Sequence, residues 1–239
     1  MPTARHTATD VSFNSQMRYR ALPGTVSKPE DSGKPTKHGM KTQETRELLL
    51  RAAERIFVRD GYEKAELGEI ARLAGRTKGA IYAQFKSKED VFLALVQDHA
   101  LRRRAIMRKF MEHSSTIEGN LDAFRKYFLD FATDDTWGFL LLEFRLYSVR
   151  NPESQERFRK VYESIVPVNE EEAYSNLLGP ASRNKEAISR TIAVHTGFSM
   201  LTALQLECRF DPNIVDSGAV RKIAGQLFDM LFRNSALGT

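Results

Sequence analysis

The sequence predicts an all-α protein, and three observations on its 239 residues lead to this fold class. From residue 44 onward, apolar residues recur at helical spacing, without a convincing alternation of the kind that marks strands. Helix-capping residues precede these segments, and Gly or Pro follows them. Hydrophobic residues make up 41% of the chain and charged residues 28%, a balance typical of proteins that bury a core.

Residues 1–42 are predicted to form a disordered, basic N-terminal extension. They are rich in Thr, Ser, Pro, Gly and Lys and show no sustained periodicity. Residues 1–43 hold seven Lys/Arg against three Asp/Glu, a net charge of +4, whereas residues 44–99 are neutral and residues 100–239 carry +1. DNA binding by the folded part therefore has to be judged from where its charges lie. The extension is interpreted as an arm with nonspecific DNA affinity or as inert, and Met40 is an alternative start.

The first predicted helix begins after residue 44. Thr45 is a suitable N-cap, Glu47 lies in the first turn near the positive end of the helix dipole, and Gly61 is expected to end the helix. One face of this helix carries Leu49, Ala52, Ala53 and Ile56.

Two short helices follow, and their spacing predicts a helix-turn-helix. The first ends at Gly75, and the second begins after Thr77, so that a tight turn joins them. Gly79 and Ala80 are small where the backbone has to approach DNA. Such a motif places its second helix in a major groove. The apolar residues expected to hold the two helices together are Leu67, Ile70, Ala71, Ala74, Ile81 and Phe85.

Polar residues around this motif are the predicted DNA contacts. Lys78 can reach a phosphate or a guanine edge, and the Tyr82 hydroxyl can donate to a phosphate. Ser87 and Asp90 have the spacing of a capping box, and the helix start beside Lys88 offers a second anion site. The predicted DNA-binding residues are Thr45, Arg76, Thr77, Lys78, Ala80, Tyr82, Gln84 and Lys88.

The segment from Thr45 to Glu89 resembles the N-terminal domain of TetR-family regulators. The run Leu67–Ala71, followed by Thr77 and Gly79–Tyr82, is especially similar to the branch of efflux-pump repressors. The resemblance implies a one-component homodimeric regulator, with a helix-turn-helix domain over residues 43–103 and a ligand-binding and dimerisation domain over residues 104–239. The other matching positions are Arg46, Ile56-Phe57, Gly61-Tyr62, Ala74-Gly75, Lys78, Phe85 and Ser87-Lys88.

The chain departs from the family pattern at three places, and these departures affect which DNA sequence is recognised more than whether DNA is bound. Ala65 and Glu66 stand where many members cap the second helix with Thr or Ser, and Glu66 repels a nearby phosphate. Arg76 replaces an apolar turn residue and can extend outward to a phosphate. Ala83 replaces a bulkier aromatic or His residue, which removes one base contact.

Longer helices are predicted for the rest of the chain, over 117–132, 136–149, 152–177, 184–209 and 215–234. The helix over 184–209 is apolar on more than one face, which indicates burial on several sides. In the family the last two helices pair with a second subunit; a core helix of a monomer is the alternative. The predicted interface residues are Val194, Phe198, Leu201, Val220, Ile223, Leu227, Phe228 and Leu231.

Aromatic residues in the same region are candidates for the wall of a ligand pocket. Aromatic residues at helical spacing also occur in plain cores, and a histidine with satisfied hydrogen bonds is the alternative for His195. The predicted pocket residues are Met107, Phe110, Phe128, Phe131, Trp137, Leu141, Phe144 and His195.

The sequence therefore predicts a DNA-binding transcriptional regulator that is not an enzyme, because no nucleotide-binding, zinc-protease or nucleophile-elbow motif is present. The preferred hypothesis is a cytoplasmic repressor, released from a palindromic operator by a small hydrophobic ligand. A ligand-independent DNA-binding protein and an activator are the alternatives. The expected partners are double-stranded operator DNA, an effector and a second copy of the chain, with no cofactor, metal or membrane. Cys208 is the single cysteine, read as a small core residue or a redox sensor, and it excludes an intrachain disulfide.

Overall fold

The computed structural model describes residues 37–181 and 188–233, and helices form almost all of their regular structure. This confirms the predicted all-α fold. None of the helices in this part of the chain is long and apolar enough to cross a membrane. The helices are α2 (Lys37–Lys64), α3 (Leu67–Leu73), α4 (Lys78–Gln84), α5 (Lys88–Met111), α6 (Ile117–Phe131), α7 (Asp135–Arg150), α8 (Gln155–Ile165), α9 (Glu170–Leu178), α10 (Arg190–Phe210) and α11 (Ser217–Phe228), with the short turns η1 (Pro152–Ser154) and η2 (Asp229–Arg233).

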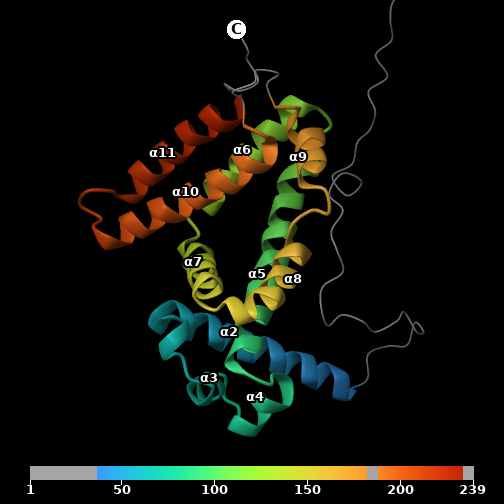
Figure 1. The fold of residues 1–239 in the computed structure, drawn as a ribbon, viewed down its shortest axis with the longest axis vertical. Helices are drawn as coiled ribbons and strands as arrows, with labels where there is room; N and C mark the ends of the chain where they lie inside the picture. The colour runs from blue at the N-terminus through green and yellow to red at the C-terminus, as the bar shows by residue number, and fades with distance from the viewer. Residues whose placement is uncertain (1–36, 182–187, 234–239) are drawn as a thin grey trace, which may run out of the picture.

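The helices form two groups that α5 connects (Figure 1). α2, α3 and α4 lie at one end of the molecule, and α5 runs from there to the opposite end, where it packs on α6, which also contacts α9. α10 and α11 form a hairpin that projects to one side, while α7 lies between this hairpin and α2. α7 therefore contacts both groups.

Two glycines shape the N-terminal group as expected. Gly61 has φ 74° and ψ 172°, which breaks the helical path inside α2, and Gly75 has φ 65° in the turn between α3 and α4. Both values lie in the left-handed region that favours glycine. The start of α2 differs from the prediction, because the helix begins at Lys37 and Thr45 lies inside it rather than at its N-cap. Residues 1–36 of the predicted extension lie outside the described residues.

Side-chain caps define the next two helix starts. Thr77 Oγ1 accepts a hydrogen bond from the Ala80 amide at 3.2 Å, and Ser87 Oγ accepts from the Asp90 amide at 3.1 Å. The Asp90 carboxylate accepts from the Lys86 amide at 3.0 Å. In a capping box it would accept from the amide of the N-cap residue Ser87, so the contact is displaced by one residue. Such caps satisfy amides that lack an intrahelical acceptor.

The helix predicted over 152–177 is wrong in one respect, because the chain breaks between α8 and α9. Pro167 has no amide hydrogen and disfavours the helical conformation at the residue before it. Val166 is accordingly extended, with φ −104° and ψ 158°. Asn169 then caps α9 by accepting from the Glu172 amide at 3.5 Å.

Aromatic rings on α6, α10 and α11 fill the core of the C-terminal group. The Phe128 ring lies 5.3 Å from Phe198 and 5.6 Å from Phe228, and Phe232 is fully buried beside them. Ring pairs at such spacing add to the free energy gained from burial alone.

A charged contact joins α2 to α5 across the two groups. The Glu54 carboxylate lies 2.8 Å from His99 Nε2 and 2.9 Å from Arg102 Nη2. Burial opposes the ionisation of Glu54, but the hydrogen bonds from His99 and Arg102 outweigh it and lower the Glu54 pKa from 4.5 to about 2.

We expect Glu54→Gln to lower the free energy of unfolding at pH 7. A carboxyl with a depressed folded-state pKa stabilises the fold above its unfolded pKa, and this contribution is lost as the pH falls from about 4.5 toward about 2. Urea unfolding across this window should show the difference between wild type and variant shrinking as the pH falls. A difference that stays constant with pH would contradict this role for Glu54, and Glu44→Gln, on the exposed start of α2, is the control.

Candidate nucleic-acid interface and effector pocket

The polar edge of α4 points away from the protein. α3 and α4 lie at the tip of the N-terminal group (Figure 1). Lys78 is exposed and the Tyr82 side chain is 50% exposed, whereas Ile81 and Phe85 on the opposite face are buried. This leaves α4 able to enter a groove of DNA with its polar side first.

The other predicted contacts differ in how they are held. Thr77 is exposed at the N-cap of α4, while Ala80 and Gln84 are half-buried. Arg76 is half-buried and its Nη1 donates to the Gly75 carbonyl at 3.2 Å. Thr45 is half-buried on α2.

Lys88, another residue of the predicted DNA-binding set, has partners within the chain. Its Nζ donates to the Glu63 carbonyl at 2.8 Å and lies 4.7 Å from the centroid of the Tyr62 ring. A lysine at this position satisfies a carbonyl at the carboxyl end of α2. The structure therefore gives Lys88 a capping role, and the exposed Lys86 two residues earlier is the cation nearer to solvent. Sequence reasoning missed the contact between Lys88 and Glu63, because it joins residues 25 positions apart.

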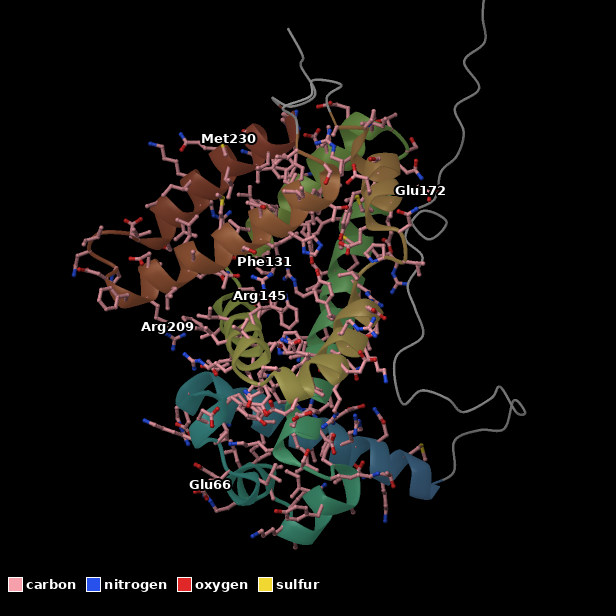
Figure 2. All side chains as sticks on the ribbon, in the orientation of Figure 1. Glu66, Phe131, Arg145, Glu172, Arg209 and Met230 are labelled. Carbon is pink, nitrogen blue, oxygen red and sulfur yellow. The ribbon has the colours of Figure 1, made fainter. Side chains whose placement is uncertain are left out.

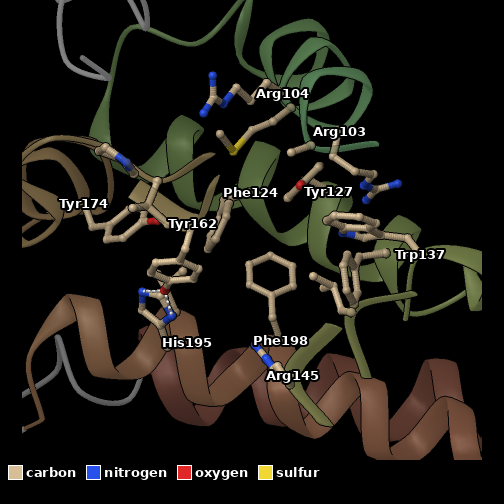
Figure 3. Close-up of a pocket in the computed structure, with 17 residues that line it drawn as sticks. Arg103, Arg104, Phe124, Tyr127, Trp137, Arg145, Tyr162, Tyr174, His195 and Phe198 are labelled. Carbon is tan, nitrogen blue, oxygen red and sulfur yellow. Dashed lines mark hydrogen bonds between the residues drawn. The ribbon is translucent and has the colours of Figure 1, made fainter. Parts of the chain in front are cut away.

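A cavity of about 160 Å³ lies inside the C-terminal group (Figure 3). It is lined from α5, α6, α7, α8 and α10, together with residues of the α8–α9 connection and of α9. Of the predicted pocket residues, Met107, Phe131, Trp137, Leu141 and His195 line it.

The other three predicted pocket residues lie elsewhere. Phe128 is buried against Phe228, and Phe144 packs on Phe158 at 5.4 Å and on Phe92 at 6.3 Å. Phe110 is half-buried, and the centroid of its ring lies 6.5 Å from that of Tyr127. Helical spacing marks these positions as apolar but does not tell core from cavity wall.

Sequence reasoning missed the polar part of the cavity. Arg103, Arg104 and Arg145 line it, as do Tyr127, Tyr162 and Tyr174. Arg103 is buried, its Nη1 lies 2.8 Å from an Asp130 oxygen, and its guanidinium carbon lies 4.7 Å from the centroid of Tyr127. These residues are scattered through the sequence, so no local pattern could have grouped them.

A hydrogen-bonded chain of Tyr162, His195 and Glu170 forms one side of the cavity. The Tyr162 hydroxyl lies 2.9 Å from His195 Nδ1, and His195 Nε2 contacts the Glu170 carboxylate. Burial and, after it, the Glu170 charge raise the Tyr162 pKa to about 12, so this phenol keeps its proton at neutral pH. His195 thus has satisfied hydrogen bonds and lines the cavity at the same time.

α7 connects this cavity with the N-terminal helices. Trp137, a cavity residue, stacks on His99 with 5.2 Å between ring centroids and 5° between planes, and His99 contacts Glu54 of α2. Farther along α7, a Glu143 oxygen accepts from the Tyr62 amide at 3.2 Å, directly after Gly61.

Most of the predicted interface residues are buried within the chain itself. Val194, Leu201, Val220, Leu227, Phe228 and Leu231 are all buried, and Phe198 packs into the aromatic core; Ile223, at 37% exposure, faces outward. The exposed apolar side chains of the hairpin are instead Ile192, Met200, Leu206, Phe210, Ile214, Ile223 and Met230, and Figure 2 shows Met230 at its outer edge.

The fold and the outward edge of α4 define a helix-turn-helix DNA-binding protein. The family model described as "Bacterial regulatory proteins, tetR family" matches residues 49–95. The N-terminal part of the chain therefore contains a DNA-binding domain similar to that of TetR-family bacterial transcriptional regulators. The curated proteins that are similar to this region are named as transcriptional regulators, in agreement with the prediction that the chain is not an enzyme.

Two curated relatives share the N-terminal region. The transcriptional activator FasR of Mycolicibacterium smegmatis is 34% identical over 99 residues, which cover 41% of this chain and 45% of FasR. The transcriptional repressor BepR of Brucella suis is 47% identical over 53 residues, covering 22% of this chain and 25% of BepR. The matches therefore span less than half of either relative.

The solved structures extend the likeness to the whole fold. The regulator FadR of Bacillus subtilis, solved in complex with stearoyl-CoA, aligns with a TM-score of 0.57 at 19% identity, over 78% of this chain and 97% of FadR. At this identity the likeness concerns the fold.

We expect Lys78→Met and Lys88→Met to separate DNA contact from capping. Lys78→Met should leave stability unchanged and make the salt dependence of DNA binding shallower by about one phosphate contact. Lys88→Met should lower the free energy of unfolding by about 1 kcal/mol, because the Glu63 carbonyl loses its donor. Urea unfolding and fluorescence anisotropy at several salt concentrations measure the two quantities. A shallower salt slope for Lys88→Met would show that Lys88 contacts DNA as well as the Glu63 carbonyl.

Proposed function

We propose that the protein is a sequence-specific transcriptional regulator that binds a palindromic operator as a homodimer and responds to a small ligand. The observation that carries the DNA-binding part is α4, which exposes Lys78 and Tyr82 while Ile81 and Phe85 anchor it. The proposed division is a DNA-binding domain over 43–103 and an effector and dimerisation domain over 104–239.

The α10–α11 hairpin is the proposed dimer surface. Ile192, Met200 and Phe210 are exposed apolar residues of α10, and Phe210 is 84% exposed. Ile223 and Met230 continue an apolar surface on α11 and η2. Exposed apolar side chains gathered on a projecting element are typical of protein interfaces. Two hairpins packed face to face would form a four-helix interface related by a twofold axis.

The cavity is the proposed effector site. A completely filled core would favour a DNA-binding protein without an effector, whereas the cavity of about 160 Å³ favours a regulated one. FadR, whose fold is similar, was solved with stearoyl-CoA. An effector touching Trp137 would act on α2 through His99 and Glu54, and through the α7 contact to Tyr62.

Release from DNA would follow from a shift between two dimer states. In the DNA-bound state the two α4 helices have to lie about 34–36 Å apart to enter successive major grooves. A ligand that binds the other state better moves the population away from this spacing. FasR is named an activator and BepR a repressor, so a similar N-terminal domain occurs both in proteins that activate and in proteins that repress transcription. We propose a repressor, which is the simpler outcome of ligand-driven release.

Selection of DNA fragments by the purified protein tests the DNA-binding proposal. We expect the recovered sites to contain an inverted repeat whose half-sites lie about one helical turn or a multiple of it apart. Tyr82→Phe should weaken binding to specific and random DNA alike, because a phosphate contact carries no sequence information. Fragments without symmetry, or no enrichment at all, would contradict the proposal.

Phe210→Glu tests the dimer surface. We expect the charge to dissociate the dimer, to be seen as a monomer in analytical ultracentrifugation, and to lower operator affinity by more than about tenfold. Val149→Glu is the matched control, because Val149 is an apolar residue of α7 with 77% exposure that lies outside the hairpin. A dimeric Phe210→Glu protein would exclude this surface.

A further inference from the structure

The residues that line the cavity include basic side chains but no acidic ones. They include Arg103, Arg104, Arg145 and His195, and no Asp or Glu is among them. The Arg103 charge is balanced from outside the cavity wall by Asp130 and Asp134, and Glu170 lies behind His195. Arg145 differs from these residues, because it takes part in none of the ion pairs formed among the described residues. The cavity therefore favours an anion over a cation.

Arg145 lies at the mouth of the cavity. It lines the cavity and also two outer hollows, one against α8 and one against α10. Its Nη1 donates to Ser199 Oγ at 3.1 Å, a neutral acceptor that leaves other guanidinium donors for a ligand. In the view of Figure 3 Arg145 lies below Phe198, with Tyr162 and His195 to their left. A planar guanidinium in this position is suited to bind a carboxylate through two parallel hydrogen bonds.

The interior limits the apolar part of the ligand to about one ring. An apolar cavity of about 150 Å³ accommodates benzene, and this cavity measures about 160 Å³. Its inner walls are flat rings, Phe124, Phe131, Trp137 and Phe198 among them. A ring inserted between them can take offset and edge-to-face positions, which an alkyl chain of equal volume cannot exploit.

We propose that the effector is a small aromatic monocarboxylate, with its ring among Phe131, Trp137 and Phe198 and its carboxylate on Arg145. Tyr162 completes the anion site, because its hydroxyl can donate to the carboxylate when its hydrogen turns from His195 Nδ1 toward the ligand. This proposal rests on the effector pocket of the proposed function and adds the chemical class that the pocket selects.

The single tryptophan of the chain, Trp137, is a direct probe, because it lines the cavity. Benzoate and phenylacetate are titrated against benzamide, their neutral counterpart, and against benzylammonium, a cation of similar size. We expect saturable fluorescence changes with the carboxylates, binding at least about tenfold weaker with benzamide, and none with benzylammonium. Equal binding of the neutral or cationic probe would overturn the proposal, as would the absence of any carboxylate binding at millimolar concentration.

Variants of Arg145 test the carboxylate contact. Arg145→Gln should weaken carboxylate binding by about 10- to 100-fold and leave benzamide binding unchanged, while Arg145→Lys should lie between. Arg150→Gln removes the same charge from the exposed end of α7 and should bind like wild type. Circular dichroism and binding to the selected DNA site check that each variant is folded. A protein that binds its DNA site but not the carboxylates would refute this ligand class alone, and an Arg145→Gln protein with unchanged carboxylate affinity would refute the role of Arg145.

Discussion

The aromatic contacts of Tyr62 hold the DNA-binding helices to the rest of the protein. Gly61 turns the chain in the left-handed region, so that Tyr62 leaves the path of α2 and packs between Phe92 at 5.0 Å and Tyr147 at 4.1 Å. A Cβ on Gly61 would lie 3.2 Å from Glu143 Oε1, so the same residue lets α7 approach this closely. The orientation of α3 and α4 relative to the helical bundle depends on this junction, since α2 carries both.

The helix-turn-helix could be predicted from the sequence because the interactions that form it are local. Gly75 and the Thr77 cap act within a few residues of themselves, and Ile81 and Phe85 follow from helical spacing. The contact of Lys88 with the Glu63 carbonyl could not be predicted in this way, because it depends on where α2 ends in space. Pro167 was a local signal for the break after α8, and it was overlooked within an otherwise helical pattern.

The effector domain was predicted less completely because its helices are apolar on several faces. Periodicity shows that α10 and α11 are buried on more than one side, but it does not say which side belongs to the chain's own core. The structure assigns Leu201 and Phe228 to that core and leaves Phe210 outside. For the same reason the aromatic half of the cavity could be anticipated, whereas Arg103 and Arg145 come together only when α5 and α7 pack.

α7 makes the cavity and the DNA-binding helices mechanically dependent on each other. Trp137, Leu141 and Arg145 face the cavity from this helix, while Glu143 and Tyr147 contact Tyr62. Because a helix rises about 1.5 Å per residue and its backbone is stiff, α7 cannot shift at the cavity without shifting at the Tyr62 junction. A close-packed junction moves between discrete arrangements rather than deforming gradually. The proposed ligand contacts aromatic rings near Trp137 at one end and Arg145 at the other. It is therefore expected to stabilise one position of α7, and through α7 one orientation of α4.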